Sequence, residues 1–328
     1  MTASRRTGRP SSASAAMRPA RPRRTSSASS RPSRMFAVTA SLMGEKDTRT
    51  ALNRPRLPGF PYTANPMSES INLIAMNVGN TRTQMGRSVS GELTDVTSLS
   101  NEDHAGIIDQ VVTWWSYLPD TSPRAVLLAS VNDPIADKLA STLTDQLSEA
   151  PYRIGRDLPI PIAEELDPET LTGVDRLLNA AAAWNTAKQA CVVVDAGTCI
   201  TIDFVDGAGT FHGGAITPGA TMQLDAMHRG SDALPELDFM RPDDDPFGRS
   251  TAQAMLHGVY HGIRGSVRQL VELYALRYGA YPMVIATGGD AEMLFADDEL
   301  IDRIVPNLTL VGITTTARQV LSADGGDD

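Results

Sequence analysis

Two short turns, each placed directly after an apolar run, constrain the fold of this chain more than any other feature. Residues 71–76 are mostly apolar and lead into the first turn, Asn77-Val78-Gly79-Asn80-Thr81. Residues 192–194 are all Val and lead into the second turn, Asp195-Ala196-Gly197-Thr198. An apolar run, a glycine turn and a resumed alternation of apolar and polar residues predict a β-hairpin. Because the pattern occurs on both sides of the chain's middle, we expect two related halves.

The residue types in these turns favour phosphate chemistry. Gly197 lets backbone N–H groups approach a bound anion closely, and Thr198 adds a hydroxyl donor. The carboxylate of Asp195 would repel a phosphate but suits a cation that accompanies one. An ordinary hairpin remains the alternative interpretation for either turn alone. Together, the two turns predict a site that holds one polyphosphate between the halves.

Composition excludes several classes of function. The chain has 328 residues, is 41% hydrophobic and carries a formal net charge of −10, which argues against general nucleic-acid affinity. No run approaches the roughly 18 consecutive apolar residues of a membrane span. Cys191 and Cys199 flank the central strand, and we expect both to be reduced, buried thiols. These features predict a cytoplasmic protein that binds neither membranes nor nucleic acid.

The first 66 residues differ from the rest of the chain. They are rich in Arg, Ser and Pro and contain no acidic residue before Glu45. Such a segment buries too little apolar surface to offset the entropy of ordering it, so we expect a disordered extension. Its composition also suits an organelle transit peptide, and a third possibility is translation from Met67. We favour an untranslated or dispensable extension over a functional basic arm. It is followed by an N-terminal half (67–190) and a C-terminal half (191–328).

Periodicity along the globular part indicates alternating strands and helices, and hence an α/β fold. Helical spacing or start signals predict helices over residues 104–118, 133–147 and 176–190. A long helix is predicted to open within residues 248–251 and to run to about residue 278, and a further helix is predicted at Ala291. Besides the strands of the two hairpins, further strands are predicted over residues 125–129, 211–219, 284–287 and 308–312. The last of these is expected to enter a final helix.

Other chemistry-bearing residues have simpler interpretations. The run Asp243–Asp245 is typical of a solvated loop. His257 and His261 are four residues apart on a predicted helix and could share a metal, but the sequence offers no evident third ligand and no H-E-x-x-H pattern. We therefore interpret them as packing or surface residues. Trp114 and Trp115 are expected on the core-facing side of a helix rather than on a stacking platform.

Six short motifs, taken in order, resemble the type III pantothenate kinase family. They are Asn77-x-Gly79-Asn80-Thr81, Gly173-x-Asp175-Arg176, Asp195-x-Gly197-Thr198, Gly213-Gly214-x-Ile216-x-Pro218-Gly219, Gly248-x-Ser250-Thr251 and Thr287-Gly288-Gly289. The resemblance covers about residues 70–320. It implies the fold of acetate and sugar kinases, actin and heat-shock chaperone ATPases: two duplicated actin-like (ribonuclease H-like) α/β halves around a nucleotide cleft.

The same resemblance implies an activity and residue roles. The family transfers phosphate from ATP to pantothenate, giving 4′-phosphopantothenate, the first step of coenzyme A synthesis. Asp195 is then the ligand of K⁺ or NH₄⁺, and Asp175 is the general base that accepts the proton of the pantothenate hydroxyl. The expected ATP contacts are Asn77, Val78, Gly79, Asn80, Thr81, Arg82, Thr83, Gln84 and Thr198 at the phosphates, with Gly288 and Gly289 beside the adenosine. The expected pantothenate contacts are Gly173, Val174, Asp175, Arg176 and, from the neighbouring subunit of a homodimer, Thr251.

The sequence departs from the family pattern in two places. Asn77 stands where the family usually has Asp, which removes a charge and predicts weaker retention of Mg²⁺. Residues 164–170 contain no Tyr, although the family usually places one there in the pantothenate pocket. Two other functions therefore remain as alternatives to pantothenate kinase. One is a non-catalytic regulator resembling the Bvg accessory factor group, and the other is a related kinase for another small hydroxylated substrate.

Overall fold

The computed structural model describes residues 71–119 and 123–324. The predicted disordered extension, residues 1–66, lies outside the described residues. Eleven strands and seven helices follow one another in the described part of the chain. The strands are β1 (Asn72–Val78), β2 (Arg82–Val89), β3 (Glu92–Ser100), β4 (Arg124–Ser130), β5 (Tyr152–Arg153), β6 (Ala163–Glu164), β7 (Cys191–Ala196), β8 (Cys199–Val205), β9 (Thr210–Pro218), β10 (Met283–Thr287) and β11 (Arg303–Ile304). The helices are α1 (His104–Tyr117), α2 (Asp133–Leu147), α3 (Val174–Ala187), α4 (Ala220–Gly230), α5 (Thr251–Tyr278), α6 (Ala291–Phe295) and α7 (Leu308–Asp324).

The strands form two sheets with the same internal order. The first sheet runs β3-β2-β1-β4-β5, and the second runs β9-β8-β7-β10-β11 with β6 added beside β9. In each sheet the three strands of the meander are antiparallel, and the next two strands are parallel to its first strand. This repeated order confirms the predicted duplicated, actin-like (ribonuclease H-like) α/β fold.

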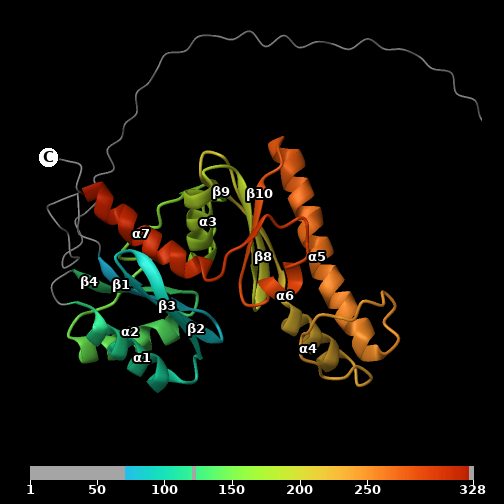
Figure 1. Cartoon of the computed structure of the whole chain (residues 1–328), viewed down its shortest axis with the longest axis horizontal. Helices are drawn as coiled ribbons and strands as arrows, with labels where there is room; N and C mark the ends of the chain where they lie inside the picture. Colours follow the sequence, from blue (N-terminus) through green and yellow to red (C-terminus); the bar gives the residue numbers. More distant parts are fainter. Residues whose placement is uncertain (1–70, 120–122, 325–328) are drawn as a thin grey trace, which may run out of the picture. The chain divides into compact units, whose positions relative to one another are not determined.

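The first sheet is covered on both faces, which explains the apolar character of its central strands. β1 and β4 are almost wholly buried, as expected for neighbouring parallel strands. Helices α1 and α2 cover one face through residues such as Ile107, Val111 and Leu139. Helix α7 crosses the other face and packs against α3, as Figure 1 shows. α3 follows the last strand of the first sheet and α7 follows β11 in the second, so the two helices occupy equivalent places in the repeat.

The second sheet packs against the long helix α5. Ser250 accepts a hydrogen bond from the backbone N–H of Gln253 at 3.2 Å and starts the helix, and Gly279 ends it in a left-handed conformation with φ of 84°. The predicted long helix, opening within residues 248–251 and ending at about residue 278, is therefore confirmed. His257 lies buried on this helix with its ring stacked on that of His261, which agrees with the packing interpretation.

The predicted strand over residues 308–312 is wrong, because this run is the first turn of α7. Five apolar-rich residues cannot distinguish a strand from a buried helix by periodicity alone. Gly312 lets α7 pack closely on α3 as a helix, because a larger residue would place its Cβ against the backbone of Leu178. The strands β3, β5, β6 and β11 and the helix α4 were not predicted. Neither β3 nor β11 has a strongly apolar pattern.

The remaining predicted helices and strands are confirmed to within a few residues, and both Trp114 and Trp115 are buried in the core. None of the helices within residues 71–119 and 123–324 combines the length and apolar character needed to cross a membrane. We propose residues 190 and 191 as the boundary between the halves, since β7 opens the second copy of the meander.

Candidate functional site

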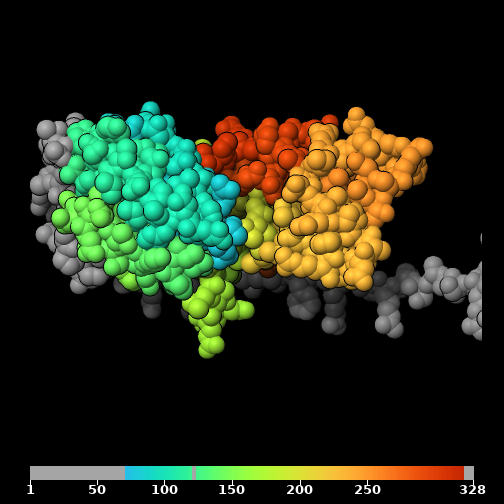
Figure 2. Space-filling model, turned by 90° about the horizontal axis from the view of Figure 1, so that it is seen from below, coloured from blue at the N-terminus to red at the C-terminus, as the bar shows by residue number. Residues whose placement is uncertain are grey.

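A cleft of about 1410 Å³ opens between the two hairpin turns. In Figure 2 it is the hollow between the first-sheet residues, in cyan and blue, and the golden region that contains α4. The first sheet contributes Asn77, Gly79, Asn80, Thr81, Arg82, Gln84, Ser98 and Ser100. The second sheet and α6 contribute Asp195, Gly197, Thr198, Thr287, Gly288, Gly289, Asp290 and Glu292. The rest of the lining comes from α4 (Thr221, Met222, Asp225, Ala226, Arg229) and from the β11–α7 segment (Ile304, Pro306, Asn307, Leu308, Thr309).

The first turn is held from behind by Asn101. Its Nδ2 donates to the carbonyl oxygen of Gly79 at 2.9 Å, and its Oδ1 accepts from the hydroxyl of Thr83 at 2.7 Å. The backbone N–H of Asn101 donates to Thr81 at 3.0 Å. Val78 and Thr83 are therefore buried behind the turn, while Asn80 and Thr81 are exposed in the cleft. Successive side chains of a strand point to opposite faces, which explains why some of the residues predicted to contact the phosphates point into the core.

The second turn is held by close backbone approach. A Cβ on Gly219 would overlap the carbonyl oxygens of Gly197 and Thr198. Gly288 has a φ of +97°, and a Cβ there would stand 2.5 Å from Oδ1 of Asp195. Only glycine fits such positions without displacing its neighbours. The glycines of three separate motifs thus converge on one turn.

Asp195 takes part in a short polar chain that reaches two helices. The Nδ2 of Asn179, on α3, donates to Oδ2 of Asp195 at 2.8 Å, and Thr309, on α7, donates to Oδ1 of Asn179 at 2.9 Å. Burial, with a smaller contribution from the nearby charge of Asp175, raises the pKa of Asp195 to about 6. A cation bound beside this carboxylate would relieve both effects.

Asp175 lies in the first turn of α3, where the sequence predicted it. Gly173, rather than Asp175, is the N-cap residue, so Asp175 does not cap the helix. Oδ1 of Asp175 accepts a hydrogen bond from the backbone N–H of Arg176 at 2.8 Å. Burial raises the pKa of Asp175, and the hydrogen bond and positive charge of Arg176 oppose the rise. The carboxylate is therefore a better proton acceptor than an exposed Asp.

Arg176 is fixed by a buried partner. Its Nε donates to Oδ2 of Asp203 at 3.0 Å, and its Nη2 pairs with Oδ1 of the same residue. The guanidinium also lies over the ring of Phe211. Asp203 is almost completely buried, so this bidentate pair anchors the start of α3 to β8.

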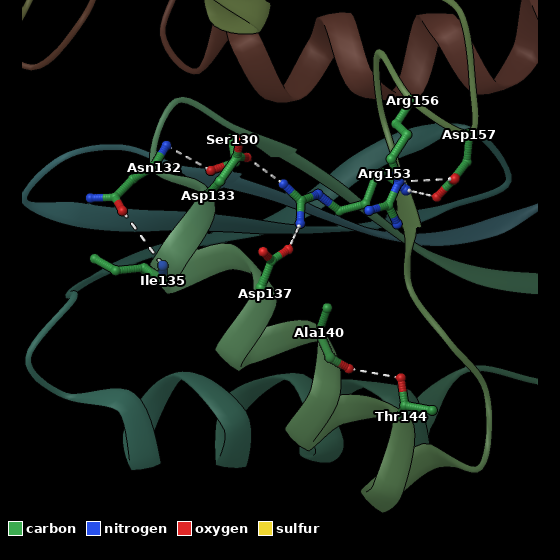
Figure 3. Close-up of polar contacts among 10 residues, drawn as sticks. All are labelled: Ser130, Asn132, Asp133, Ile135, Asp137, Ala140, Thr144, Arg153, Arg156 and Asp157. Carbon is green, nitrogen blue, oxygen red and sulfur yellow. Dashed lines mark hydrogen bonds and ion pairs between the residues drawn. The ribbon is translucent and has the colours of Figure 1, made fainter.

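The segment between β4 and α2 borders the start of α3. Val131 donates from its backbone N–H to Val78, and its side chain approaches Gly173. Figure 3 shows how this segment is fixed: Asn132 caps α2, and Arg153 pairs with Asp133 at 2.7 Å and Asp137 at 2.6 Å. The segment thus contacts the first turn at Val78 and lies beside the start of α3.

The charge of the cleft is unfavourable for a bare polyphosphate. Among the described lining residues, Asp195, Asp225, Asp290 and Glu292 are acidic, whereas Arg82 and Arg229 are basic. Within residues 71–119 and 123–324, no group of three His, Cys, Asp or Glu side chains could hold a metal ion.

The structure brings together most of the predicted nucleotide residues but not all the predicted substrate residues. Asn77, Gly79, Asn80, Thr81, Arg82, Gln84, Asp195, Thr198, Gly288 and Gly289 line the cleft. Gly173, Val174, Asp175 and Arg176 do not line it, although Asp175 is near enough to Asp195 to influence its pKa. Thr251 is exposed at the start of α5 and does not line the cleft.

Sequence reasoning missed several polar residues that support the site. Asn179 and Asp203 are buried polar residues, one in an alanine-rich helix and one in an apolar strand. An isolated polar residue in an apolar helix or strand can indicate a supporting role at a site, because a buried polar group needs a hydrogen-bond partner. The sequence around Asn101 and Asn307 gives no comparable indication that these residues support the site. Asn307 accepts a 2.6 Å hydrogen bond from Gln84 and so links the two sides of the cleft.

Known proteins match about three quarters of this chain. The family model for type III pantothenate kinase matches residues 73–273. The type III pantothenate kinase of Dehalococcoides mccartyi is 30% identical over 254 residues, covering 75% of this chain and 96% of the relative. That of Ruegeria pomeroyi is 32% identical over 252 residues, covering 75% and 96%.

Among solved structures, a Campylobacter jejuni protein named for the Baf family of transcriptional activators has a TM-score of 0.48 at 22% identity. It covers 75% of this chain, and the match covers 98% of that protein. The sequence matches are the stronger comparison, because they extend over nearly the full length of their relatives at about 30% identity. The chain belongs to the type III pantothenate kinase family.

Proposed function

We propose that this protein transfers the γ-phosphoryl group of ATP to the primary hydroxyl of pantothenate, giving 4′-phosphopantothenate and ADP. Family membership supports the reaction. The observation that carries the mechanism is a cleft lined by both glycine–threonine turns, with Asp175 close enough to raise the pKa of Asp195. Phosphoryl transfer needs positioned phosphates, neutralised charge and a base beside the attacking oxygen.

The two turns are assigned to the phosphates. The exposed backbone and side chains of Asn80, Thr81 and Thr198 line the cleft and offer N–H and O–H donors. Gly288 and Gly289 leave room at the other end of the second turn for the adenosine. Val78 and Thr83 support the first turn from the core rather than touching the nucleotide.

Asp175 is assigned the role of general base. As the pantothenate oxygen bonds to the γ-phosphorus, its proton passes to the Asp175 carboxylate and the bond from that phosphorus to the ADP oxygen breaks. The raised pKa of Asp175 favours proton acceptance. Arg176, fixed by Asp203, keeps N–H groups that can bind pantothenate beside the base.

Asp195 is assigned to K⁺ or NH₄⁺. The carboxylate of Asp195 lines the cleft and has a raised pKa, so it suits a cation that phosphate oxygens also coordinate. Asn77 adds an uncharged carbonyl oxygen on the opposite turn, where Mg²⁺ would accompany the nucleotide. These cations would supply the positive charge that the lining residues lack.

We further propose a cytoplasmic homodimer in which Thr251 of one subunit completes the pantothenate site of the other. Thr251 is exposed and outside its own cleft, and the neighbouring Phe247 exposes 73% of its surface. Leu171, just before Gly173, is 99% exposed. A partner covering both segments would explain these exposed apolar residues.

The reaction is tested by supplying labelled pantothenate, ATP and Mg²⁺ with or without K⁺. We expect labelled 4′-phosphopantothenate only when K⁺ or NH₄⁺ is present. Absence of product under every condition would exclude the kinase and favour the regulator. Product from another hydroxylated compound, but not from pantothenate, would identify a related kinase.

The shared site is tested by mixing two inactive variants. Asp175→Asn and Thr251→Ala are purified separately, then combined under conditions that exchange subunits. A site built from two subunits regains activity, because one mixed site contains both native residues. If activity stays at the level of the separate variants although exchange is verified, Thr251 does not act across an interface.

A further inference from the structure

Arg229 is a cationic residue of the cleft to which no role has yet been given. Together with Arg82 it supplies the positive side chains among the described lining residues. The two arginines come from different sides, Arg82 from β2 and Arg229 from α4.

Helix α4 presents one continuous face to the cleft. Thr221, Asp225 and Arg229 follow one another at intervals of four residues, and all three line the cleft. The helix begins directly after Gly219, which packs tightly on the second turn. Arg229 is therefore carried on a rigid element attached to the turn that is assigned to the phosphates.

The contacts of Arg229 leave its guanidinium available. Its nearest acidic partner is Asp225, with Nη2 and Oδ2 3.8 Å apart, and the two side chains are 81% and 42% exposed. An exposed pair at this spacing contributes little to stability and is easily exchanged for another partner. Arg176, in contrast, is held in a buried bidentate pair.

We propose that Arg229 binds the phosphates of the nucleotide from the α4 side of the cleft, opposite Arg82. The identity of the ligand as ATP rests on the proposed function; the role of Arg229 rests on its place in the cleft. A guanidinium binds phosphate oxygens through a planar fork of N–H donors, which an ammonium cannot reproduce. Arg229 also offsets the repulsion that Asp195 and Asp225 exert on a polyphosphate.

The test measures nucleotide binding directly, in the full chain and without pantothenate. Isothermal titration with a non-hydrolysable ATP analogue, Mg²⁺ and K⁺ compares the wild-type protein with Arg229→Ala, Arg229→Lys and Arg277→Ala. Arg277 is the matched control, an exposed arginine in the last turn of α5 that does not line the cleft. We expect Arg229→Ala to weaken binding by roughly ten- to hundredfold. Arg229→Lys should recover part of the loss, and Arg277→Ala should bind like the wild type.

Steady-state kinetics with pantothenate separates this inference from the proposed function. We expect Arg229→Ala to raise the KM for ATP while the KM for pantothenate stays within twofold. Wild-type nucleotide affinity in Arg229→Ala, in a protein that phosphorylates pantothenate, would overturn the inference and leave the function standing. If Arg229→Ala weakens nucleotide binding but the wild-type protein makes no 4′-phosphopantothenate, the inference stands and the proposed substrate is wrong.

Discussion

The first and second turns occupy equivalent places in the repeat, yet they are held by different means and carry different charges. The first follows β1, begins with the uncharged Asn77 and is held by the side chain of Asn101. The second follows β7, begins with Asp195 and is held by the backbone approach of Gly219 and Gly288. Duplication thus preserved the strand order, whereas the two polar residues at the ends of β1 and β7 diverged.

The difference teaches where the chemistry of the cleft is concentrated. The charge of Asp175, the proposed base, acts on Asp195, which also accepts a hydrogen bond from Asn179, so the second turn and the base are electrostatically linked. Asn77, on the first turn, is uncharged and adds no charge to the pair Asp175 and Asp195. We therefore expect substitutions to have larger effects near the second turn than near the first.

The largest effect is expected for Asp175→Asn, which removes the proposed base coupled to the second turn. Its kcat should fall roughly 10²- to 10⁴-fold, because the proton of the attacking hydroxyl loses its acceptor. Circular dichroism should show an unchanged fold. The pKa of Asp195, followed by NMR, should fall, since the charge of Asp175 helps to raise it. A kcat within a few-fold of the wild-type value would remove Asp175 from the mechanism.

Asp195→Asn makes the second turn resemble the first. We expect at least tenfold lower activity and loss of the response to K⁺, because the charged ligand is gone. Asparagine keeps an oxygen that can accept the hydrogen bond from Asn179.

The same variant should be more stable than the wild type at neutral pH. The folded-state pKa of about 6 exceeds the ordinary value of 3.8, so the folded wild type holds its proton more tightly than the unfolded chain. Its stability therefore declines as the pH rises from about 4 to about 6, and the resulting cost at pH 7 is about 1–3 kcal/mol. Urea unfolding without added K⁺ should show this difference at pH 7 and a much smaller one at pH 4. An Asp195→Asn protein that is less stable at pH 7 would contradict the raised pKa.

A pair of glycine substitutions compares how the turns are held. Gly219→Ala should destabilise the fold by about 1–3 kcal/mol, since its Cβ would collide with the backbone of the second turn. At Gly79 a Cβ would lie 3.1 Å from the carbonyl oxygen of Arg82, so Gly79→Ala should cost less than about 1 kcal/mol. Chemical denaturation of both variants measures the contrast. Equal losses would show that the two turns are packed alike.

Asn77→Asp gives the first turn the charge that the second already has, and its expected effect is the smallest. The half-saturating concentration of Mg²⁺ should fall, by up to about tenfold, because a carboxylate attracts the cation more strongly than an amide. Activity at saturating Mg²⁺ should change little. Titration of Mg²⁺ at fixed ATP measures the shift, and a higher requirement for Mg²⁺ would exclude Asn77 from the cation's surroundings.

Much of the fold follows from local pattern. The two hairpins, the buried strand β4 and the helices α1, α2 and α5 were predicted to within about a residue, because their apolar spacing, caps and glycine turns act over a few neighbouring residues. The first turn of α7 could not be predicted, since its conformation depends on packing against α3 at Gly312. The 1–66 extension remains a prediction.

The sequence by itself determined that the chain repeats a glycine–threonine hairpin, and the ordered motifs pointed to the kinase family. Only the tertiary structure decided which members of those motifs face the cleft. Val78 and Thr83 turn into the core, while Arg229, distant in the chain and in no recognised motif, lines the cleft. The physical reason is that hydrogen bonding and strand or helix propensity are local, whereas burial and the approach of charges depend on which segments the folded chain brings together.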